Sequence, residues 1–317
     1  MSIERTKSKQ KVKEPKTKIT WKEIKRQKVL LFWAAIMVVY GVVFYYLPLA
    51  GWTMAFQNYK PRLGIFHSQF VGWDKFRTLF SDMTFIRVIR NTLAMGVINL
   101  VVTFITAIVF AILLNEIHKK WWKKTVQTLS YLPHFISLVV VCGMVKELLT
   151  AGGPINKLLS AVGIGKIAFM SEPGWFDFVY IASGVWQALG WGTILYLTAM
   201  TGINTELYEA ASMDGANRFQ QIIHVTIPGI LPTIMTLLIM DIGGIVTSSN
   251  MQKILLLYNP LNQEKADIIG TLVYRMGITG GNFSYAAAVG LFEGLIGLIL
   301  VSIANFLSKK LTETSLW

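Results

Sequence analysis

Apolar residues along this chain fall into six long runs, which polar and charged segments separate. At about 1.5 Å per helical residue, a run of about 20 residues crosses the ~30 Å hydrocarbon layer of a bilayer. Runs such as "LAMGVINLVVTFITAIVFAILL" (93–114) lack the period of two residues that a transmembrane β-barrel requires. The pattern predicts an all-α, polytopic membrane protein. Its six transmembrane helices cover about 29–50, 90–114, 128–149, 177–200, 230–250 and 285–307.

The composition agrees with this fold class and excludes several kinds of chemistry. Of the 317 residues, 53% are hydrophobic and 15% are charged, whereas soluble domains carry roughly 25% charged residues. Cys142 is the only cysteine, so we expect no internal disulfide and no thiolate cluster. The four histidines have no paired ligand spacing, so we predict no metal site. "GIGKI" (163–167) lacks the Ser or Thr of a phosphate loop, so any nucleotide chemistry belongs to another chain.

The placement of charge predicts the orientation. The net charge is +13, and residues 1–28 hold eleven Lys and Arg against three Glu. The segment 116–127 and the pair Lys309 and Lys310 are also basic, and the positive-inside tendency assigns all three to the cytoplasm. We therefore predict a basic cytoplasmic tail (1–28), a transmembrane domain (29–311) and a cytoplasmic tail (312–317). Lipid headgroups explain a polybasic tail beside a first span, so we expect no nucleic-acid partner.

The segment 201–228 is predicted to be a cytoplasmic elbow of two short helices. Asn204 or Thr205 is a suitable N-cap, and Gly215 interrupts the helical pattern. Pro228 and Pro232 are expected where the fifth span begins, because a missing N–H costs least there.

This elbow is acidic, unlike the other cytoplasmic segments. It holds Glu206, Glu209 and Asp214 against Arg218 alone, so anionic lipid does not attract it. A protein cleft that offers Arg or Lys would suit it, and a solvated connector is the alternative.

The elbow resembles the EAA motif of permease subunits of binding-protein-dependent ABC importers. That motif reads Glu-Ala-Ala, three residues, Gly, nine residues, then Ile-x-Leu-Pro; here Val225 and Ile227 replace its Ile and Leu. "VGWDKFRTLF" (71–80), "GGPINKLL" (152–159) and the ending 285–311 resemble the maltose-type family. They are most similar to its branch for polysaccharide and complex-oligosaccharide uptake in Gram-positive bacteria. The matching elbow residues are Glu209, Ala210, Ala211, Asp214, Gly215, Ala216 and Pro228.

The resemblance implies a maltose-permease-like core in the cell membrane and a role in import. It implies a heterodimer with a second homologous permease, two ATPase subunits that hold ATP and Mg, and an extracellular, lipid-anchored solute-binding protein. The elbow would then be a coupling helix in a groove of the ATPase, and the cargo an oligosaccharide or polysaccharide fragment. This chain would be no enzyme and would hold no cofactor.

Three other functions are alternatives to this one. A permease for another solute class is the main one. A secondary transporter would usually show inverted internal repeats, and a membrane enzyme would need converging acid, base or metal groups. We find neither pattern in the sequence.

Polar and aromatic residues within the spans are candidates for the transport path, because polar groups at membrane depth face a cavity or a partner helix. Gln187 and Trp191 are four residues apart and share a helix face, which suits the hydroxyls and C–H faces of a sugar. Packing is the alternative for Trp, and a hydrogen bond to a neighbouring span is the alternative for Asp241. The main candidates are Trp186, Gln187, Trp191, Asp241, Asn250 and Glu293, with Asn91, Asn99, Ser248, Ser249 and Asn305 beside them.

Overall fold

The structure is a computed structural model that describes residues 26–245 and 251–312. The chain divides into two compact units, residues 1–51 and 52–317. The described part of the first unit begins with α2 (Lys28–Gly41), which continues through the π-helical turn η1 (Val42–Tyr46) into η2 (Leu47–Phe56). No residue of α2 is buried, which suits an apolar helix in contact with lipid.

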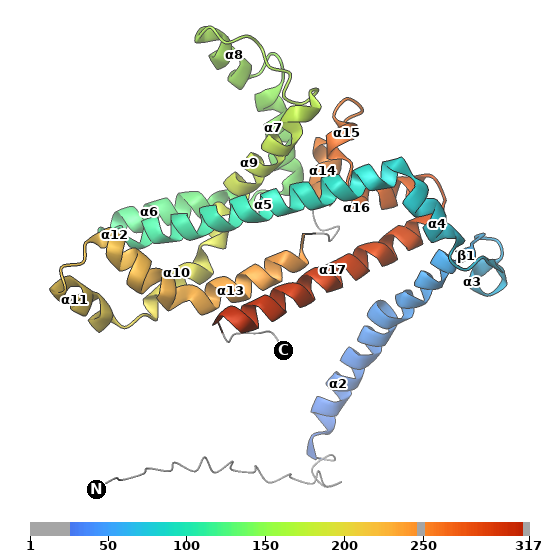
Figure 1. The fold of residues 1–317 in the computed structure, drawn as a ribbon, viewed down its shortest axis with the longest axis horizontal. Coiled ribbons are helices and arrows are strands. Elements are labelled where there is room, and N and C mark those ends of the chain that lie inside the picture. The colour runs from blue at the N-terminus through green and yellow to red at the C-terminus, as the bar shows by residue number, and fades with distance from the viewer. Residues whose placement is uncertain (1–25, 246–250, 313–317) are drawn as a thin grey trace. The chain divides into compact units, whose positions relative to one another are not determined.

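The second unit is a helical bundle built around α5 (Met83–Asn115) (Figure 1). On one side α5 packs against α9 (Pro173–Gly192), which continues into α10 (Ile194–Thr201). On the other side lie α13 (Ile227–Gly243) and α17 (Phe283–Thr312), which pack against each other. Short elements of this unit include β1 (Gln57–Asn58), α3 (Gly64–His67), β2 (Gln69–Phe70), α4 (Asp74–Ser81) and α14 (Met251–Leu257). Strand β1 pairs with β2 antiparallel.

The prediction of six spans is confirmed for the part of the chain that the structure describes. Six helical stretches are long and apolar enough to cross a bilayer. They are Lys28–Phe56, Met83–Asn115, Leu138–Ala161, Pro173–Thr201, Arg218–Gly243 and Phe283–Lys310.

The third run differs from its predicted bounds of 128–149. It consists of α6 (Lys120–Tyr131), the 3-10 turn η3 (Leu132–Phe135) and α7 (Leu138–Leu149), and α8 (Pro154–Ala161) follows. Pro133 cannot donate a backbone N–H, and Ile136 and Ser137 are extended. Ser137 then caps α7 by accepting from the Val140 N–H at 3.4 Å. The run is therefore a broken helix, which hydrophobicity alone does not reveal.

The fifth run also differs from its prediction, because helix begins at 218 rather than near 230. α12 (Arg218–Gln221) and the π-helical turn η4 (Ile222–Thr226) lead without a break into α13. Pro228 lies in the first turn of α13, just after the π-helical turn η4. Pro232 lies inside the helix rather than at its start. A wide turn shifts the hydrogen-bond pattern and accommodates a residue that cannot donate.

Three apolar clusters along α5 form the core of the second unit. Met95 packs with residues of α7, α9 and α14, and buried Cys142 belongs to this cluster, as its apolar surroundings in the sequence predict. Phe85 and Val88 pack with α4 and α17, and Ala111 packs with α10 and α13. α5 therefore holds the other helices in position.

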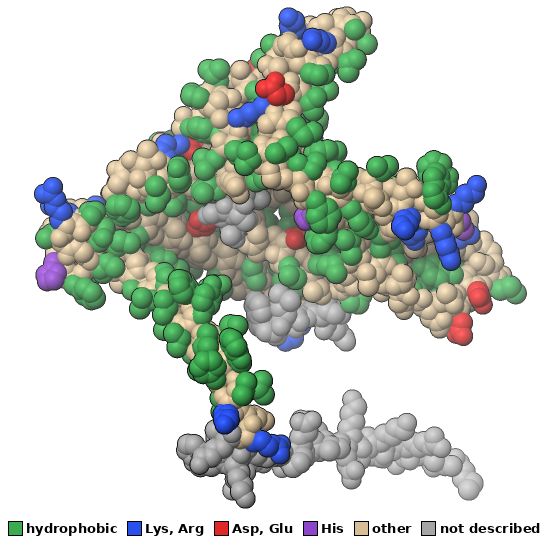
Figure 2. Space-filling model, turned by 180° about the vertical axis from the view of Figure 1, so that it is seen from behind, with side chains coloured by type: hydrophobic (Ala, Val, Ile, Leu, Met, Phe, Trp, Pro, Cys, Tyr) green, Lys and Arg blue, Asp and Glu red, His purple; other side chains and the backbone are tan. Residues whose placement is uncertain are grey.

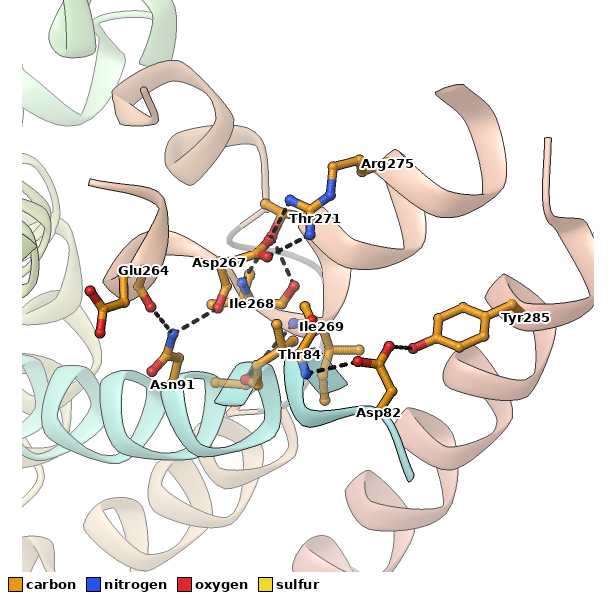
Figure 3. Close-up of polar contacts among 12 residues, drawn as sticks. Asp82, Thr84, Asn91, Glu264, Asp267, Ile268, Ile269, Thr271, Arg275 and Tyr285 are labelled. Carbon is orange, nitrogen blue, oxygen red and sulfur yellow. Dashed lines mark hydrogen bonds and ion pairs between the residues drawn. The ribbon is translucent and has the colours of Figure 1, made fainter. Parts of the chain in front are cut away.

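Polar contacts fasten one end of α5 to the segment between α14 and α17 (Figure 3). This segment holds α15 (Gln263–Ala266), α16 (Ile269–Val273) and η6 (Tyr274–Thr279). The Asn91 amide donates to the backbone oxygens of Glu264 and Asp267, at 2.8 and 3.2 Å. The Thr92 hydroxyl accepts from the Ile269 N–H at 2.9 Å. Asn91 is thus occupied in fixing this segment rather than in lining a path.

Asp82 ties the start of α5 to α17. Its carboxylate caps α5 by accepting from the Thr84 N–H at 2.8 Å, and it accepts from the Tyr285 hydroxyl at 2.8 Å. Burial alone would raise the pKa of Asp82, but the bonds from Tyr285 and Thr84 hold that pKa below its ordinary value. The ionised carboxylate is therefore the form that this junction stabilises.

Candidate functional site

The first helix and the turn of the acidic elbow have the form that the sequence predicts, whereas the predicted second short helix is the start of the fifth span. Its first helix is α11 (Thr205–Met213), and the Asn204 side chain caps it by accepting from the Glu206 N–H at 3.1 Å. Gly215 has a φ of +79°, in the left-handed region that favours glycine. The Gly215 N–H donates to Ser212 O at 3.1 Å, and the Ala216 N–H donates to Ala211 O at 2.9 Å. These two bonds end the helix as a Schellman motif.

Side-chain bonds hold the second arm of the elbow against the first. Asn217 and Gln220 form a capping box at the start of α12. The buried Gln221 amide donates to the Ser212 hydroxyl at 2.9 Å and to Ala216 O at 3.1 Å. The Tyr208 and Thr226 hydroxyls lie 3.0 Å apart. The elbow therefore has a defined shape without any partner.

None of the residues that the structure describes covers the outer face of α11. Glu209, Ala210 and Asp214 are exposed, and Met213 is 89% exposed. Figure 2 shows acidic side chains low on the right of the view, below a group of Lys and Arg side chains. An exposed helix with acidic and apolar groups is suited to a cleft with basic and apolar walls.

The second candidate feature is a cavity of about 390 Å³ within the bundle. Its walls come from α5, α9, α10 and α13. It joins two predicted path residues that lie far apart in the sequence, Trp191 and Asp241. The lining residues are Thr103, Phe104, Thr106, Ala107, Val185, Ala188, Leu189, Trp191, Gly192, Ile194, Leu195, Tyr196, Leu237 and Asp241.

Trp191 is held by the break in the third run. Its ring stacks on His134, with centroids 4.4 Å apart and planes 2° from parallel, and Phe135 meets it edge-on at 6.0 Å. Trp191 is nevertheless 48% exposed. His134 and Phe135 are site residues that the sequence analysis missed, although Pro133 within an apolar run was the available signal.

The predicted partner of Trp191 has a different role. The Gln187 amide donates to Ile136 O at 3.2 Å, so it satisfies the non-helical backbone after η3. Gly190 allows this close approach, because a Cβ there would lie 2.3 Å from Ser130 O. Gln187 therefore positions the break, whereas Trp191 lines the cavity.

The other predicted path residues do not line this cavity. Trp186 lines a separate apolar cavity of about 310 Å³ beside α7, with Met144, Leu148 and Phe178. Glu293 is half-buried on α17, and Asn305 is buried on the same helix. Asn99 lines a narrow space with Gly96 and Tyr180. Ser248, Ser249 and Asn250 lie outside the described residues.

Comparisons with known proteins assign this chain to a family. Residues 103–313 match the family described as binding-protein-dependent transport system inner membrane component. Protein LplB of Bacillus subtilis (strain 168) is 40% identical, over 94% of this chain and 94% of its own length. The polygalacturonan/rhamnogalacturonan transport system permease protein YteP of the same strain is 43% identical, over 92% of this chain and 91% of its own length.

A solved structure shares both the fold and the sequence. It is the crystal structure of a bacterial alginate ABC transporter in complex with an alginate pentasaccharide-bound periplasmic protein. One of its chains is 39% identical to this one and superposes with a TM-score of 0.87, covering 93% of this chain and 99% of that chain. This chain therefore belongs to the binding-protein-dependent transport system inner membrane component family, the multi-pass permeases of ABC importers in the cell membrane.

Proposed function

We propose that this chain forms half of the transmembrane path of an ATP-driven importer, for oligosaccharides or polysaccharide fragments delivered by an external solute-binding protein. The other half is a second, related permease subunit, and two separate ATPase subunits hold ATP and Mg. The relatives support this cargo class, because one is named for polygalacturonan and rhamnogalacturonan and another was solved with an alginate-bound periplasmic protein.

The observation that carries the proposal is the cavity that Trp191 and Asp241 share. Aromatic faces pack against the C–H faces of sugars, and a hydroxyl-rich cargo must replace its bonds to water. The Thr103 and Thr106 hydroxyls donate to the backbone oxygens of Asn99 and Val102, both at 2.6 Å. Their oxygens, like the carboxyl oxygens of Asp241, remain available as acceptors. Sugar hydroxyls are the donors that such a cavity suits.

The elbow is the proposed contact with the ATPase. Its exposed acidic helix carries the EAA pattern, with Glu209, Ala210 and Ala211 on α11 and Gly215 at the turn. The bonds of Gln221 and Tyr208 make the elbow rigid enough to transmit a movement into α13. Asp214, Ala216 and Pro228 complete the proposed contact region. A rigid lever of this kind supplies what a permease without its own nucleotide site needs.

Uptake by the reconstituted complex tests the proposal. Proteoliposomes with both permeases, both ATPase subunits and the binding protein are supplied with labelled acidic and neutral oligosaccharides. Trp191→Ala should lower uptake per assembled complex on the order of 2- to 10-fold, because an aromatic contact contributes about 0.5–1.5 kcal/mol beyond its burial. Basal ATP hydrolysis should persist.

Trp186→Ala is the matched control, since Trp186 lines the apolar cavity beside α7 instead. It should leave uptake per complex unchanged. Equal effects of the two variants would remove Trp191 from the path. Uptake of another solute class, with none of any oligosaccharide, would favour the alternative function.

A further inference from the structure

A buried ammonium lies against α9, one of the helices that form the cavity. Lys253 lies on α14 and is only 8% exposed. Its Nζ donates to Tyr180 O of α9 at 2.7 Å and lies 4.6 Å from the centre of the Tyr180 ring. Gly184 makes room for it, because a Cβ at that position would lie 2.9 Å from Nζ.

The charge of Lys253 has no acidic partner among residues 26–245 and 251–312. The ion pair found there joins Arg275 to Asp267, so no described carboxylate lies within 4.0 Å of the Lys253 Nζ. An ammonium has three donors, and a buried charge without a counter-charge costs several kcal/mol. Leu or Met would fill the same space without that cost. Charged groups retained among membrane spans typically mark the route of an ion or a substrate.

The position of Lys253 places this charge beside the cavity. Gly184 precedes Val185, which lines the cavity, and Ala188 of the lining follows one helical turn later. Asn99 lies close to Gly184 on the facing helix, and its backbone oxygen accepts from Thr103, another lining residue. Counted along either α5 or α9, the Lys253 ammonium is therefore about one helical turn from the residues that line the cavity.

We propose that Lys253 selects cargo that carries carboxylates, by pairing its ammonium with a uronate of the chain of sugars that occupies the adjoining cavity. This inference rests on the proposed function and names the charge of its cargo. It agrees with two relatives, since polygalacturonan and alginate are built from sugars that bear carboxylates. The carboxyl oxygens of Asp241, on the α13 wall of the cavity, can accept hydrogen bonds from the hydroxyls of the same sugars.

Binding to the assembled complex tests this role. Trigalacturonate and its neutral methyl ester are titrated into permease–ATPase complexes in nanodiscs, without the binding protein, for wild type and variants. Wild type should prefer the carboxylate form on the order of tenfold or more, since hydrogen bonds to charged groups are the strong ones. Lys253→Gln should bind both forms equally, and Lys253→Arg should keep the preference. Lys265→Gln, which removes an exposed charge on α15, should also keep it.

A second measurement uses the wild type alone, so it does not depend on the folding of any variant. Carbodiimide joins a carboxylate to an amine that it touches, and mass spectrometry then locates the sugar. Attachment to Lys253 during ATP turnover supports the proposal. Attachment to other lysines only, or a carboxylate preference that survives Lys253→Gln, overturns it. If the full system imports no oligosaccharide, the proposed function itself fails; if it imports them but Lys253→Gln keeps the preference, only this inference fails.

Discussion

At the scale of single residues, the Asp267 carboxylate shows how a buried charge is held in this protein. Asp267 is fully buried, accepts from the Arg275 guanidinium at 3.1 and 2.6 Å, and accepts from the Thr271 hydroxyl at 2.7 Å. The hydrogen bond to Asp267 raises the pKa of Arg275 above its usual value. The same residues close the segment that Asn91 fastens to α5 (Figure 3). A buried carboxylate is stable here only because each of its oxygens has a donor.

Arg275→Leu should therefore destabilise the protein more than its partial exposure suggests. Removing one partner of a buried pair leaves the other unpaired, and we expect a loss of about 1–3 kcal/mol, since solvent screens a side chain that is 34% exposed. The double variant Arg275→Leu/Asp267→Asn should recover part of that stability. Thermal unfolding of the solubilised complex measures both. A double variant less stable than the single one, or a loss no greater than for the exposed Lys157→Leu, would contradict this account.

At the scale of elements, breaks in helices set the positions of functional groups, both in the elbow and in the third run. Gly215 turns the chain between α11 and α12, and the exposed face of α11 is left free. In the third run the break at Pro133 brings His134 against Trp191. Non-helical backbone at membrane depth must find partners, and Gln187 supplies one. Each break thus sets the position of a side chain or a surface that an unbroken helix would place elsewhere.

Substitutions at Gly215 test the elbow as an element. The surroundings of Gly215 are open, so a new side chain meets no neighbour, and only the backbone angle is strained. Gly215→Val should weaken substrate-stimulated ATP hydrolysis and uptake while membrane insertion stays normal, because a β-branched residue disfavours positive φ. Gly215→Asn should retain most coupling, since Asn tolerates that region. If Val and Asn behave alike, the turn geometry is not what coupling requires.

At the scale of the whole molecule, the second unit has two polar ends. α6, α11 and α12 lie at one end of the bundle, and α4 lies at the other (Figure 1). The basic segment KKWWKK (119–124) forms the start of α6, at the end of the bundle that holds the elbow. α5 is 33 residues long, about 50 Å, which exceeds the hydrocarbon layer. The arrangement is that of a protein whose elbow end faces one side of the membrane.

Reporter fusions test which side that is. The placement of Lys and Arg predicts that a reporter after residue 120, or after Trp317, is cytoplasmic, and that one within 255–280 is external. Alkaline phosphatase and green fluorescent protein fusions report opposite sides, so each position is read twice. An external reporter after residue 120 would move the elbow away from any cytoplasmic ATPase. It would also contradict the coupling role proposed for Glu209 and its neighbours.

The sequence by itself determined the number of spans and the first helix and turn of the elbow. Spans follow from hydrophobicity summed over about 20 residues, which needs no knowledge of neighbours. The cap at Asn204 and the turn at Gly215 are local, because they depend on backbone preferences and on bonds a few residues long. The broken third run escaped prediction because its apolar residues continue through Pro133.

Only the tertiary structure decided which polar residues face the cavity. Helical spacing places Gln187 and Trp191 on one face of α9. Because α9 packs against the break in the third run, Gln187 donates to Ile136 O, whereas Trp191 lines the cavity. Lys253 went unnoticed for the same reason. Its partner Tyr180 lies 73 residues earlier in the chain, and burial depends on which distant residues fold around a group, not on its neighbours in sequence.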